Sequence, residues 1–490
     1  MAPINVEWDV PATDKTKPWM HDEGVVSKYK ARHGLTGTSI LSSVSKWLPP
    51  RDEHSDYWWN MAGPHFSALL QNADYSTEAQ YEALLFIHHY IAPKMGASPL
   101  AIQCERGDSG LSLDGTHFEY SWRWNQFDTK PEIRMVMEPF SRLAGTYMDP
   151  LNITPAMGIL NSMKPRVTSL DMALFNHFIA KFYDPDWHKY LETKERPIMT
   201  NVCLGFEFLG NNILPKAYFF PRKLDQSGLT AMSVWEEAIA TAIPQSTTME
   251  NVFSFVKRTA PRLGLTLAPL WLGIDVVAPA AARLKLYCVE SHTSFESVKS
   301  IMTMGGIIEI APSMLDQVWD LMKAVCNLPA DYPWNEDLPQ APQYNASTDG
   351  LDTVGLWGTF AYYFDIGVGR ELPDIKFYIP VCHYGTNDQA IASATTDWMK
   401  KNGRGQYVDA YWDSMHKIIS HRKLDESRGA QMWLSMMVKD GKLQVTTYIA
   451  PEGYHPKRGP QAKTHHQAVA ERVTGSHLDG IKHWNHRQLY

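Results

Sequence analysis

Three short apolar segments of this chain each contain a lysine followed two residues later by a tyrosine. The pairs are Lys216 and Tyr218, Lys285 and Tyr287, and Lys376 and Tyr378. In a β-strand, side chains two residues apart point to the same face, so each segment directs an ammonium group and a phenol into one space. Cations are normally kept off the buried face of a strand because their desolvation is costly. Three such strands predict a polar interior that holds an anion, for which phosphate or diphosphate is the first candidate.

These segments leave one alternative open. Lysine and tyrosine would have the same spacing on edge or surface strands that face water. The identical spacing in three segments favours the interior site, and two of the segments end at a proline, Pro221 and Pro380. Arg283 extends the middle segment, since it would lie on the same strand face as Lys285 and Tyr287.

A fourth segment, 118–125, alternates sharply between polar and aromatic residues. Glu119, Ser121 and Arg123 share one face of the expected strand. A carboxylate that is desolvated beside aromatic rings is a candidate general base, because burial raises its pKa towards neutral pH. The alternative is an ion pair between Glu119 and Arg123. The expected partner strand, 133–138, adds Arg134 as a further cation.

Composition and missing motifs exclude several functional classes. The formal net charge of −7 gives no basic field for nucleic acid, and no apolar stretch has transmembrane length. Five dispersed cysteines without a CxxC pair imply neither a zinc cluster nor a disulfide framework. Together with the lack of a secretory signal, they favour a cytoplasmic, reducing compartment. Neither a GxxxxGK(S/T) phosphate loop nor an Asp-rich cluster for Mg²⁺ occurs, so Arg and Lys would neutralise a bound diphosphate directly.

Helical and strand patterns alternate along the chain as helix, strand, strand, helix. They predict strands at 116–125, 133–138, 201–209, 214–221, 282–290, 354–366, 374–382, 430–438 and 442–450. They predict helices at 76–90, 168–183, 230–243, 249–259, 293–303, 386–402 and 407–421. Hairpins in series with a polar inner face can close into a barrel, and the helices would then cover its apolar outside. We expect one large domain, 36–455, between an N-terminal extension, 1–35, and a C-terminal tail, 456–490.

Taken together, these motifs resemble the fungal aromatic prenyltransferases of the dimethylallyltryptophan synthase superfamily, from about residue 42 to residue 456. The resemblance rests on Gly-Asp-Ser-Gly-Leu at 107–111, Phe-Glu-Tyr-Ser at 118–121, Ile-Arg at 133–134 with Glu-Pro at 138–139, Lys-Ala-Tyr-Phe-Phe-Pro at 216–221, Arg-Leu-Lys-Leu-Tyr at 283–287 and Ile-Lys-Phe-Tyr-Ile-Pro at 375–380. It implies an α+β barrel of αββα repeats, with ten antiparallel strands inside a ring of helices. It also implies transfer of a prenyl group from a prenyl diphosphate, the co-substrate, to an electron-rich aromatic ring, with no obligatory cofactor or metal.

The resemblance also implies roles for individual residues. Diphosphate binding is expected of Arg134, Lys216, Arg283, Lys285 and Lys376. Tyr218, Tyr287, Tyr378 and Tyr448 are expected to shield the allylic cation and bind the donor. Glu119 is expected to be the catalytic residue that also hydrogen-bonds the acceptor. The backbone of Leu111 is expected to contact the acceptor.

At three positions the chain departs from the family pattern. Gln444 replaces a tyrosine that often forms one wall of the shield. Cys203 stands where members that act at indole C4 of free tryptophan carry a lysine, which argues against that reaction. Ala361 stands where the residue that limits donor length is often methionine, so it leaves room for a donor longer than dimethylallyl.

We therefore expect an aromatic prenyltransferase of secondary metabolism that uses dimethylallyl diphosphate, or a longer donor such as geranyl diphosphate, in a metal-independent Friedel–Crafts alkylation. An indole-containing acceptor is expected, with a phenolic or polyketide acceptor as the alternative. A phosphohydrolase would need a metal site or nucleophile that no motif supplies, and a non-enzymatic barrel that carries a hydrophobic ligand would not need a cation-rich interior. The expected partners are the two small substrates, without nucleic acid or membrane, and assembly into a homodimer stays open.

Overall fold

The computed structural model describes residues 40–99, 109–141, 143–192, 201–224, 229–339, 358–367 and 369–458. The chain divides into two compact units, Met1–Leu48 and Pro49–Tyr490. The described part of the first unit contains helix α2 (Ile40–Trp47), and the strands of the described ranges all belong to the second unit. The expected extension, 1–35, and most of the expected tail, 459–490, lie outside the described residues, so these domain boundaries stay predictions.

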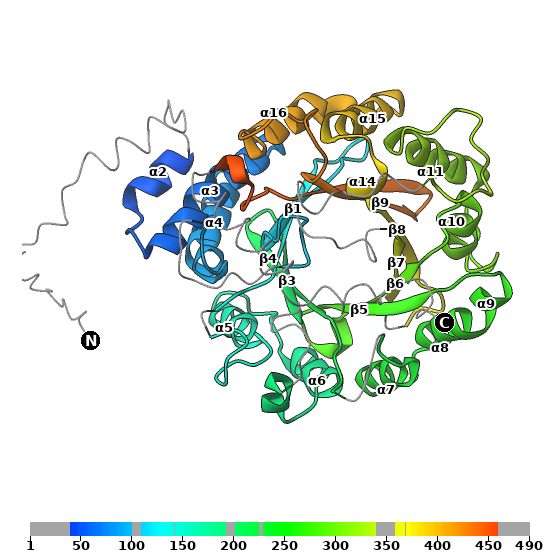
Figure 1. The fold of residues 1–490 in the computed structure, drawn as a ribbon, viewed down its shortest axis with the longest axis horizontal. Helices are drawn as coiled ribbons and strands as arrows, with labels where there is room; N and C mark the ends of the chain where they lie inside the picture. Colours follow the sequence, from blue (N-terminus) through cyan, green and yellow to red (C-terminus); the bar gives the residue numbers. More distant parts are fainter. Residues whose placement is uncertain are drawn as a thin grey trace, which may run out of the picture. The chain divides into compact units, whose positions relative to one another are not determined.

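Ten antiparallel strands close into a barrel in the second unit (Figure 1). They are β1 (Phe118–Arg123), β2 (Glu132–Met137), β3 (Val202–Leu209), β4 (Asn212–Phe219), β5 (Ala268–Asp275), β6 (Leu284–Glu290), β7 (Phe360–Ile366), β8 (Asp374–Ile379), β9 (Gln431–Lys439) and β10 (Lys442–Ile449). Each strand pairs with its neighbours along the chain, and β1 pairs with β10, with Tyr120 opposite Ile449. The closed barrel confirms the expected fold class and leaves no strand edge unpaired.

Helices surround the barrel in the second unit (Figure 1). They are α3 (Glu53–Asn72), α4 (Thr77–Phe86) with its π-helical continuation η1 (Ile87–Ile91), α5 (Thr154–Met163), α6 (Ala173–Phe182), α7 (Met232–Ala242), α8 (Thr247–Ser254), α9 (Ala260–Arg262), α10 (Phe295–Met302), α11 (Pro312–Val325), α14 (Val381–Tyr384), α15 (Asp388–Lys401) and α16 (Val408–Ile418). None of the helices in the described ranges is long and apolar enough to cross a membrane.

The alternation of side chains along each strand separates an apolar outer face from a polar inner face. On the outer face, Phe219 of β4 packs against Phe178 and Phe182 of α6, and Trp122 of β1 packs against Tyr411 of α16. Burial of each such side chain contributes roughly 1.5–3 kcal/mol. These contacts between strands and helices fix the register of strand pairing, since a shift by one residue would turn the inner lysines towards the helices.

One strand and five helices of the described ranges were not expected from the sequence, and two of these helices are α2 and the short α14. Strand β5 contains Pro269 and Gly273, which weaken the strand signal, and the pairing with β6 is irregular between Pro269 and Trp271. Helices α3, α5 and α11 were also missed. Strand β7 begins at Phe360, whereas residues 354–357 of the expected strand lie outside the described residues.

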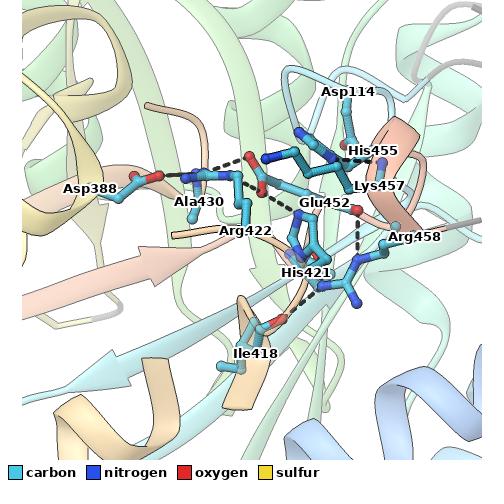
Figure 2. A network of polar contacts seen from close by, with 12 residues as sticks. Asp114, Asp388, Ile418, His421, Arg422, Ala430, Glu452, His455, Lys457 and Arg458 are labelled. Carbon is cyan, nitrogen blue, oxygen red and sulfur yellow. Dashed lines mark hydrogen bonds and ion pairs between the residues drawn. The ribbon is translucent and has the colours of Figure 1, made fainter. Parts of the chain in front are cut away.

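A buried polar network fixes the chain that follows β10 (Figure 2). The guanidinium of Arg422 lies between two carboxylates: its Nε donates to Glu452 at 2.8 Å and its Nη2 donates to Asp388 at 2.5 Å. Asp388 also accepts from the backbone N–H of Gln431 at 2.8 Å. Because the network joins α15, the end of α16 and the segment after β10, it holds the helices against one end of the barrel. Residues 456–458 of the expected tail form a 3₁₀ turn here, and Arg458 donates to the carbonyl of Glu452.

Candidate active site

Antiparallel pairing brings the inward side chains of neighbouring strands into two layers. In β4, β6 and β8, which run in one direction, the lysine precedes the tyrosine. The odd-numbered strands run the other way, so the inward carboxylates near their ends come to lie beside those lysines. Asp275 of β5 is directly opposite Lys216, and Asp365 of β7 is directly opposite Lys285. The interior therefore contains a charged layer and, next to it, an aromatic layer.

The charged layer interleaves the predicted cations with carboxylates. Glu207 of β3 accepts from Lys216 Nζ at 2.7 Å, and its Oε1 lies 3.1 Å from Arg134 Nε. Lys216 Nζ is also 3.4 Å from Asp275 Oδ1. Burial alone would raise the pKa of Glu207, but Arg134 and Lys216 outweigh it and hold the pKa well below its ordinary value. Glu207 is therefore an anion that keeps two cations in place.

The layer continues along β5, β6 and β7. Asp275 accepts from Arg283 Nε at 2.9 Å and lies 3.8 Å from Lys285 Nζ, while Arg283 also reaches Asp365 at 3.6 Å. The Lys285 side chain is only 9% exposed, whereas Arg283 is 44% exposed and lies where the layer meets solvent. Burial and the neighbouring Lys216 lower the pKa of Lys285 to about 7, while the carboxylates of Asp275 and Glu207 oppose that shift.

Lys376 differs from the other predicted cations. Its Nζ donates to Thr446 Oγ1 at 3.3 Å, and within the described part of the chain it forms no ion pair with a carboxylate. Burial, together with Arg134, lowers its pKa well below the ordinary value. An anion that entered the layer would find in Lys376 a buried donor with no competing carboxylate.

The aromatic layer brings the four predicted tyrosines together. Ring centroids of Tyr218 and Tyr287 are 6.2 Å apart, those of Tyr287 and Tyr378 are 5.9 Å apart, and those of Tyr378 and Tyr448 are 5.8 Å apart. Lys376 Nζ lies 5.6 Å from the ring centroid of Tyr378. The layer thus offers several aromatic faces next to the cations, an arrangement that stabilises positive charge.

Two glycines make room for Tyr218. A Cβ atom on Gly205 of β3 would lie 2.9 Å from Tyr218 Cε2, and one on Gly273 of β5 would lie 3.0 Å from Tyr218 Cδ1. Real Cβ atoms essentially never show the first contact and rarely show one as short as the second, so the ring holds its position because both neighbouring strands lack a side chain there. The close packing of Tyr218 therefore explains why both strands carry a glycine at these interior positions.

Three further aromatic residues of this layer were missed by the sequence analysis. Trp271 stacks on Tyr287 with a centroid separation of 4.7 Å, Tyr363 lies 5.3 Å from Tyr287, and Trp433 lies 6.3 Å from Tyr378. Tyr363 could have been found, because it is two residues from Ala361 in an alternating strand. Trp271 could not, because its strand was not recognised. The carboxylates Glu207, Asp275 and Asp365 were missed because the spacing of lysine and tyrosine along one strand does not indicate which acidic residues of other strands lie beside them.

Glu119 lies on the inner face of β1, opposite Val136 of β2. It is 7% exposed, and its Oε2 atom has no hydrogen-bond partner among the described residues. The structure does not pair it with Arg123, which instead donates to Glu132 at 2.8 Å. Burial raises the pKa of Glu119 to about 8. A carboxyl group of this kind exchanges a proton readily near neutral pH and can bind a polar group of a ligand.

The remaining predicted positions lie around the same interior. Cys203 is buried on the inner face of β3, directly opposite Tyr218. Ala361 lies opposite Tyr378 and belongs to the buried cluster of the aromatic layer. Gln444 is opposite Met437. Leu111 donates its backbone N–H to Ser109 Oγ at 3.2 Å, while residues 107–108 of its motif lie outside the described residues.

The two layers suit cleavage of an organic diphosphate into an anion and a carbocation. The charged layer can receive the anion through several donors, and the aromatic layer can face the carbocation. Across the described ranges, no three or more His, Cys, Asp or Glu side chains are grouped so that they could hold a metal ion.

Comparison with known proteins agrees with this geometry. The family model for tryptophan dimethylallyltransferase matches residues 54–414. The prenyltransferase anuH of Penicillium roqueforti is 38% identical over 445 residues, which cover 90% of this chain and 98% of the relative. Xanthone prenyltransferase A of Emericella nidulans is 35% identical over 428 residues, covering 84% of this chain and 95% of the relative. The crystal structure of NotF in complex with brevianamide F and DMSPP has the same fold, with a TM-score of 0.67 at 19% identity, covering 84% of this chain and 99% of that chain.

Proposed function

This chain belongs to the tryptophan dimethylallyltransferase family and is an aromatic prenyltransferase, and we propose that it alkylates a phenolic aromatic ring with a prenyl group taken from a prenyl diphosphate. The observation that supports the proposal is the cationic layer directly beside a layer of aromatic faces. Cations alone would bind many phosphates, and aromatic rings alone would bind many apolar ligands. Their adjacency suits a molecule that is anionic at one end and becomes cationic at the other.

The reaction begins in the charged layer. Lys216, Lys285, Lys376, Arg134 and Arg283 bind the diphosphate and meet the charge that develops on the leaving oxygen as the C–O bond breaks. Pre-oriented donors of this kind supply the electrostatic stabilisation that usually dominates catalysis. Because ammonium and guanidinium groups do this without a metal ion, we expect the reaction to continue in excess EDTA.

The allylic cation then lies against the aromatic layer. Tyr218, Tyr287, Tyr378 and Tyr448, joined by Trp271, present π faces that stabilise positive charge. The same rings exclude water, which would otherwise capture the cation and release a prenyl alcohol. The acceptor ring attacks the cation to form a C–C bond, and the proton displaced from that carbon leaves to a base.

Glu119 is the proposed base. Its free, buried Oε2 can accept a hydrogen bond from a hydroxyl group of the acceptor. Such a bond favours the ionised carboxylate and increases electron density in the ring at the moment of attack. Replacement of Glu119 by Gln should lower kcat by at least tenfold, with a smaller change in the KM for the diphosphate. If kcat and the affinity for the diphosphate fell by the same factor, that result would contradict the role assigned to Glu119.

A phenolic acceptor is favoured over an indole by two observations. Relatives that are about a third identical to this chain over most of its length are named as xanthone prenyltransferases, and a xanthone has no indole N–H. In addition, the interior carries Cys203 where free-tryptophan enzymes that act at C4 carry a lysine. Ala361 in the aromatic layer leaves space for a chain longer than dimethylallyl, so we propose geranyl diphosphate as an accepted donor.

The test is a product assay with the full-length protein. Dimethylallyl and geranyl diphosphate are each combined with a panel of hydroxylated xanthones and related aromatic ketones, and with a panel of tryptophan and cyclic dipeptides. C-prenylated phenols, formed in EDTA, are the expected products. Prenylated indoles alone would overturn the acceptor proposal and favour the indole alternative. Pyrophosphate release without any prenylated product would indicate a hydrolase, and unchanged donor would indicate a carrier of a hydrophobic ligand.

A further inference from the structure

We infer that Glu207 and Asp275 are positioning residues of the donor site, which hold the diphosphate-binding cations charged and aimed at the barrel interior before the donor arrives. The inference rests on the proposed function, because it assumes that these cations bind the diphosphate. Neither carboxylate touches the donor in this arrangement. Each acts through the lysines and arginines that it holds.

The geometry that carries this inference is a continuous alternation of charge across neighbouring strands. Cation and carboxylate are direct cross-strand partners at four positions between β1 and β7. The partners are Arg123 and Glu132, Arg134 and Glu207, Lys216 and Asp275, and Lys285 and Asp365. The pairs are linked to one another as well, since Arg134 reaches Glu132 at 2.9 Å and Glu207 at 3.1 Å. Removal of one carboxylate would therefore release cations on both sides of it.

Glu207 and Asp275 occupy the two central places in this alternation. Glu207 holds the pair Arg134 and Lys216, and Asp275 lies within 4 Å of Lys216, Arg283 and Lys285. Asp275 Oδ1 is buried and has no hydrogen bond among the described residues, although two ammonium groups lie 3.4 and 3.8 Å away. A buried carboxylate oxygen is stable in such a place because it compensates charge on more than one side.

The physical need for these anions follows from the crowding of the cations. Like charges that lie close together repel each other, and burial away from water strengthens that repulsion and adds a desolvation penalty. A lysine can escape this repulsion by losing its proton, whereas an arginine cannot. Lys285 is the lysine whose charge depends directly on these carboxylates: burial and its cationic neighbours lower its pKa, while Asp275 and Glu207 raise it. Without these carboxylates the donor site would keep its lysines but lose part of its charge.

The charged groups around Lys285 come from every strand packed against it. They are Lys216 on β4, Asp275 on β5, Arg283 before β6, Asp365 on β7, Lys376 on β8 and Glu207 on β3. Among them Asp275 is the carboxylate that lies between Lys216 and Lys285, with Oδ1 at 3.4 Å and 3.8 Å from the two ammonium nitrogens. Its removal should therefore change the pH dependence of anion binding, rather than weaken binding equally at every pH.

The test measures binding of inorganic pyrophosphate to the full-length protein by titration calorimetry from pH 6 to pH 9. For Asp275→Asn we expect binding as tight as wild type or tighter at pH 6, because one competing negative charge is gone. At pH 9 we expect binding at least tenfold weaker than wild type, because the alkaline midpoint moves down by about one pH unit or more as Lys285 loses its proton. The Glu207→Gln variant should bind at pH 6 like wild type but lose at least tenfold in kcat, because Arg134 and Lys216 are no longer held in place.

Asp374→Asn is the matched control. This aspartate lies at the start of β8 and pairs with Lys439 at 2.7 Å and Arg370 at 3.0 Å, neither of which belongs to the charged layer. It should keep the wild-type pH profile. If Asp275→Asn and Glu207→Gln weaken binding equally at every pH and lower the midpoint of urea unfolding in proportion, the carboxylates are structural and the inference is wrong. If wild type itself binds no pyrophosphate at any pH, the proposed function fails instead.

Discussion

One buried carboxyl group, Glu119, should contribute strongly to the pH dependence of this protein's stability. In the folded chain burial raises the pKa of Glu119 from 4.5 to about 8, and no ion pair offsets that shift. In the unfolded chain water restores the ordinary value. The folded state therefore binds the Glu119 proton more tightly than the unfolded state does, and it gains stability wherever that proton is bound.

The direction and size of the effect follow from this difference. The contribution is fully present below pH 4.5 and is lost as the pH rises through about 8. One pKa unit corresponds to about 1.4 kcal/mol, so the full effect is about 5 kcal/mol, most of it between pH 5 and pH 8. Glutamine has nearly the same shape and cannot ionise. The Glu119→Gln variant should therefore gain about 4 kcal/mol relative to wild type between pH 5 and pH 9.

The assay is urea unfolding of both proteins at half-unit steps from pH 5 to pH 9. Glu309→Gln serves as the control, because Glu309 is exposed between α10 and α11. This control should follow the wild-type curve at every pH. The reasoning is refuted if the wild-type and Glu119→Gln curves run parallel over the whole range, since that result would mean that Glu119 is solvated or paired in the folded protein.

Three further perturbations test other parts of the structure. Ala361→Met puts a larger side chain into the aromatic layer, so kcat/KM should fall at least tenfold for geranyl diphosphate but less than threefold for dimethylallyl diphosphate. Gly273→Ala places a methyl group 3.0 Å from the ring of Tyr218 and should displace it; the share of donor lost to hydrolysis should rise. Arg422→Met leaves two buried carboxylates without their cation, and the free energy of unfolding should fall by about 3–5 kcal/mol, measured with urea.

Each perturbation has a matched comparison. The two donors serve as each other's control for Ala361→Met, and an equal loss with both would argue against a limit on chain length. Gly158→Ala, in α5 with no atom within 4 Å of the new methyl group, should leave the hydrolysed share unchanged. Arg166→Met, which breaks an exposed pair with Glu82, should cost less than about 1 kcal/mol. A similar small loss for Arg422→Met would mean that its network does not support the fold.

Some residues of the site could be predicted from the sequence and others could not. The lysines and tyrosines of β4, β6 and β8 were found because their spacing of two is a local property of an extended chain. Strand β5 was missed because Pro269 and Gly273 weaken the sequence pattern that is typical of a strand. Asp275 and Trp271, which lie on this strand, were therefore missed as well. The expected ion pair between Glu119 and Arg123 was one of two alternatives, and in the structure Arg123 pairs with Glu132 instead.

Alternation along single strands was thus enough to say that Lys216, Lys285 and Lys376 face one side with their tyrosines, and that this side is polar. It could not say which residues of other strands lie next to them. Closure of ten antiparallel strands decides that, because it places the end of one strand beside the start of the next. Asp275 and Lys216 are 59 positions apart in the sequence, yet they are direct partners in the barrel. The charge balance of the donor site, and with it the protonation of Lys285, is therefore a property of the closed barrel, since electrostatic energy depends on distance in space.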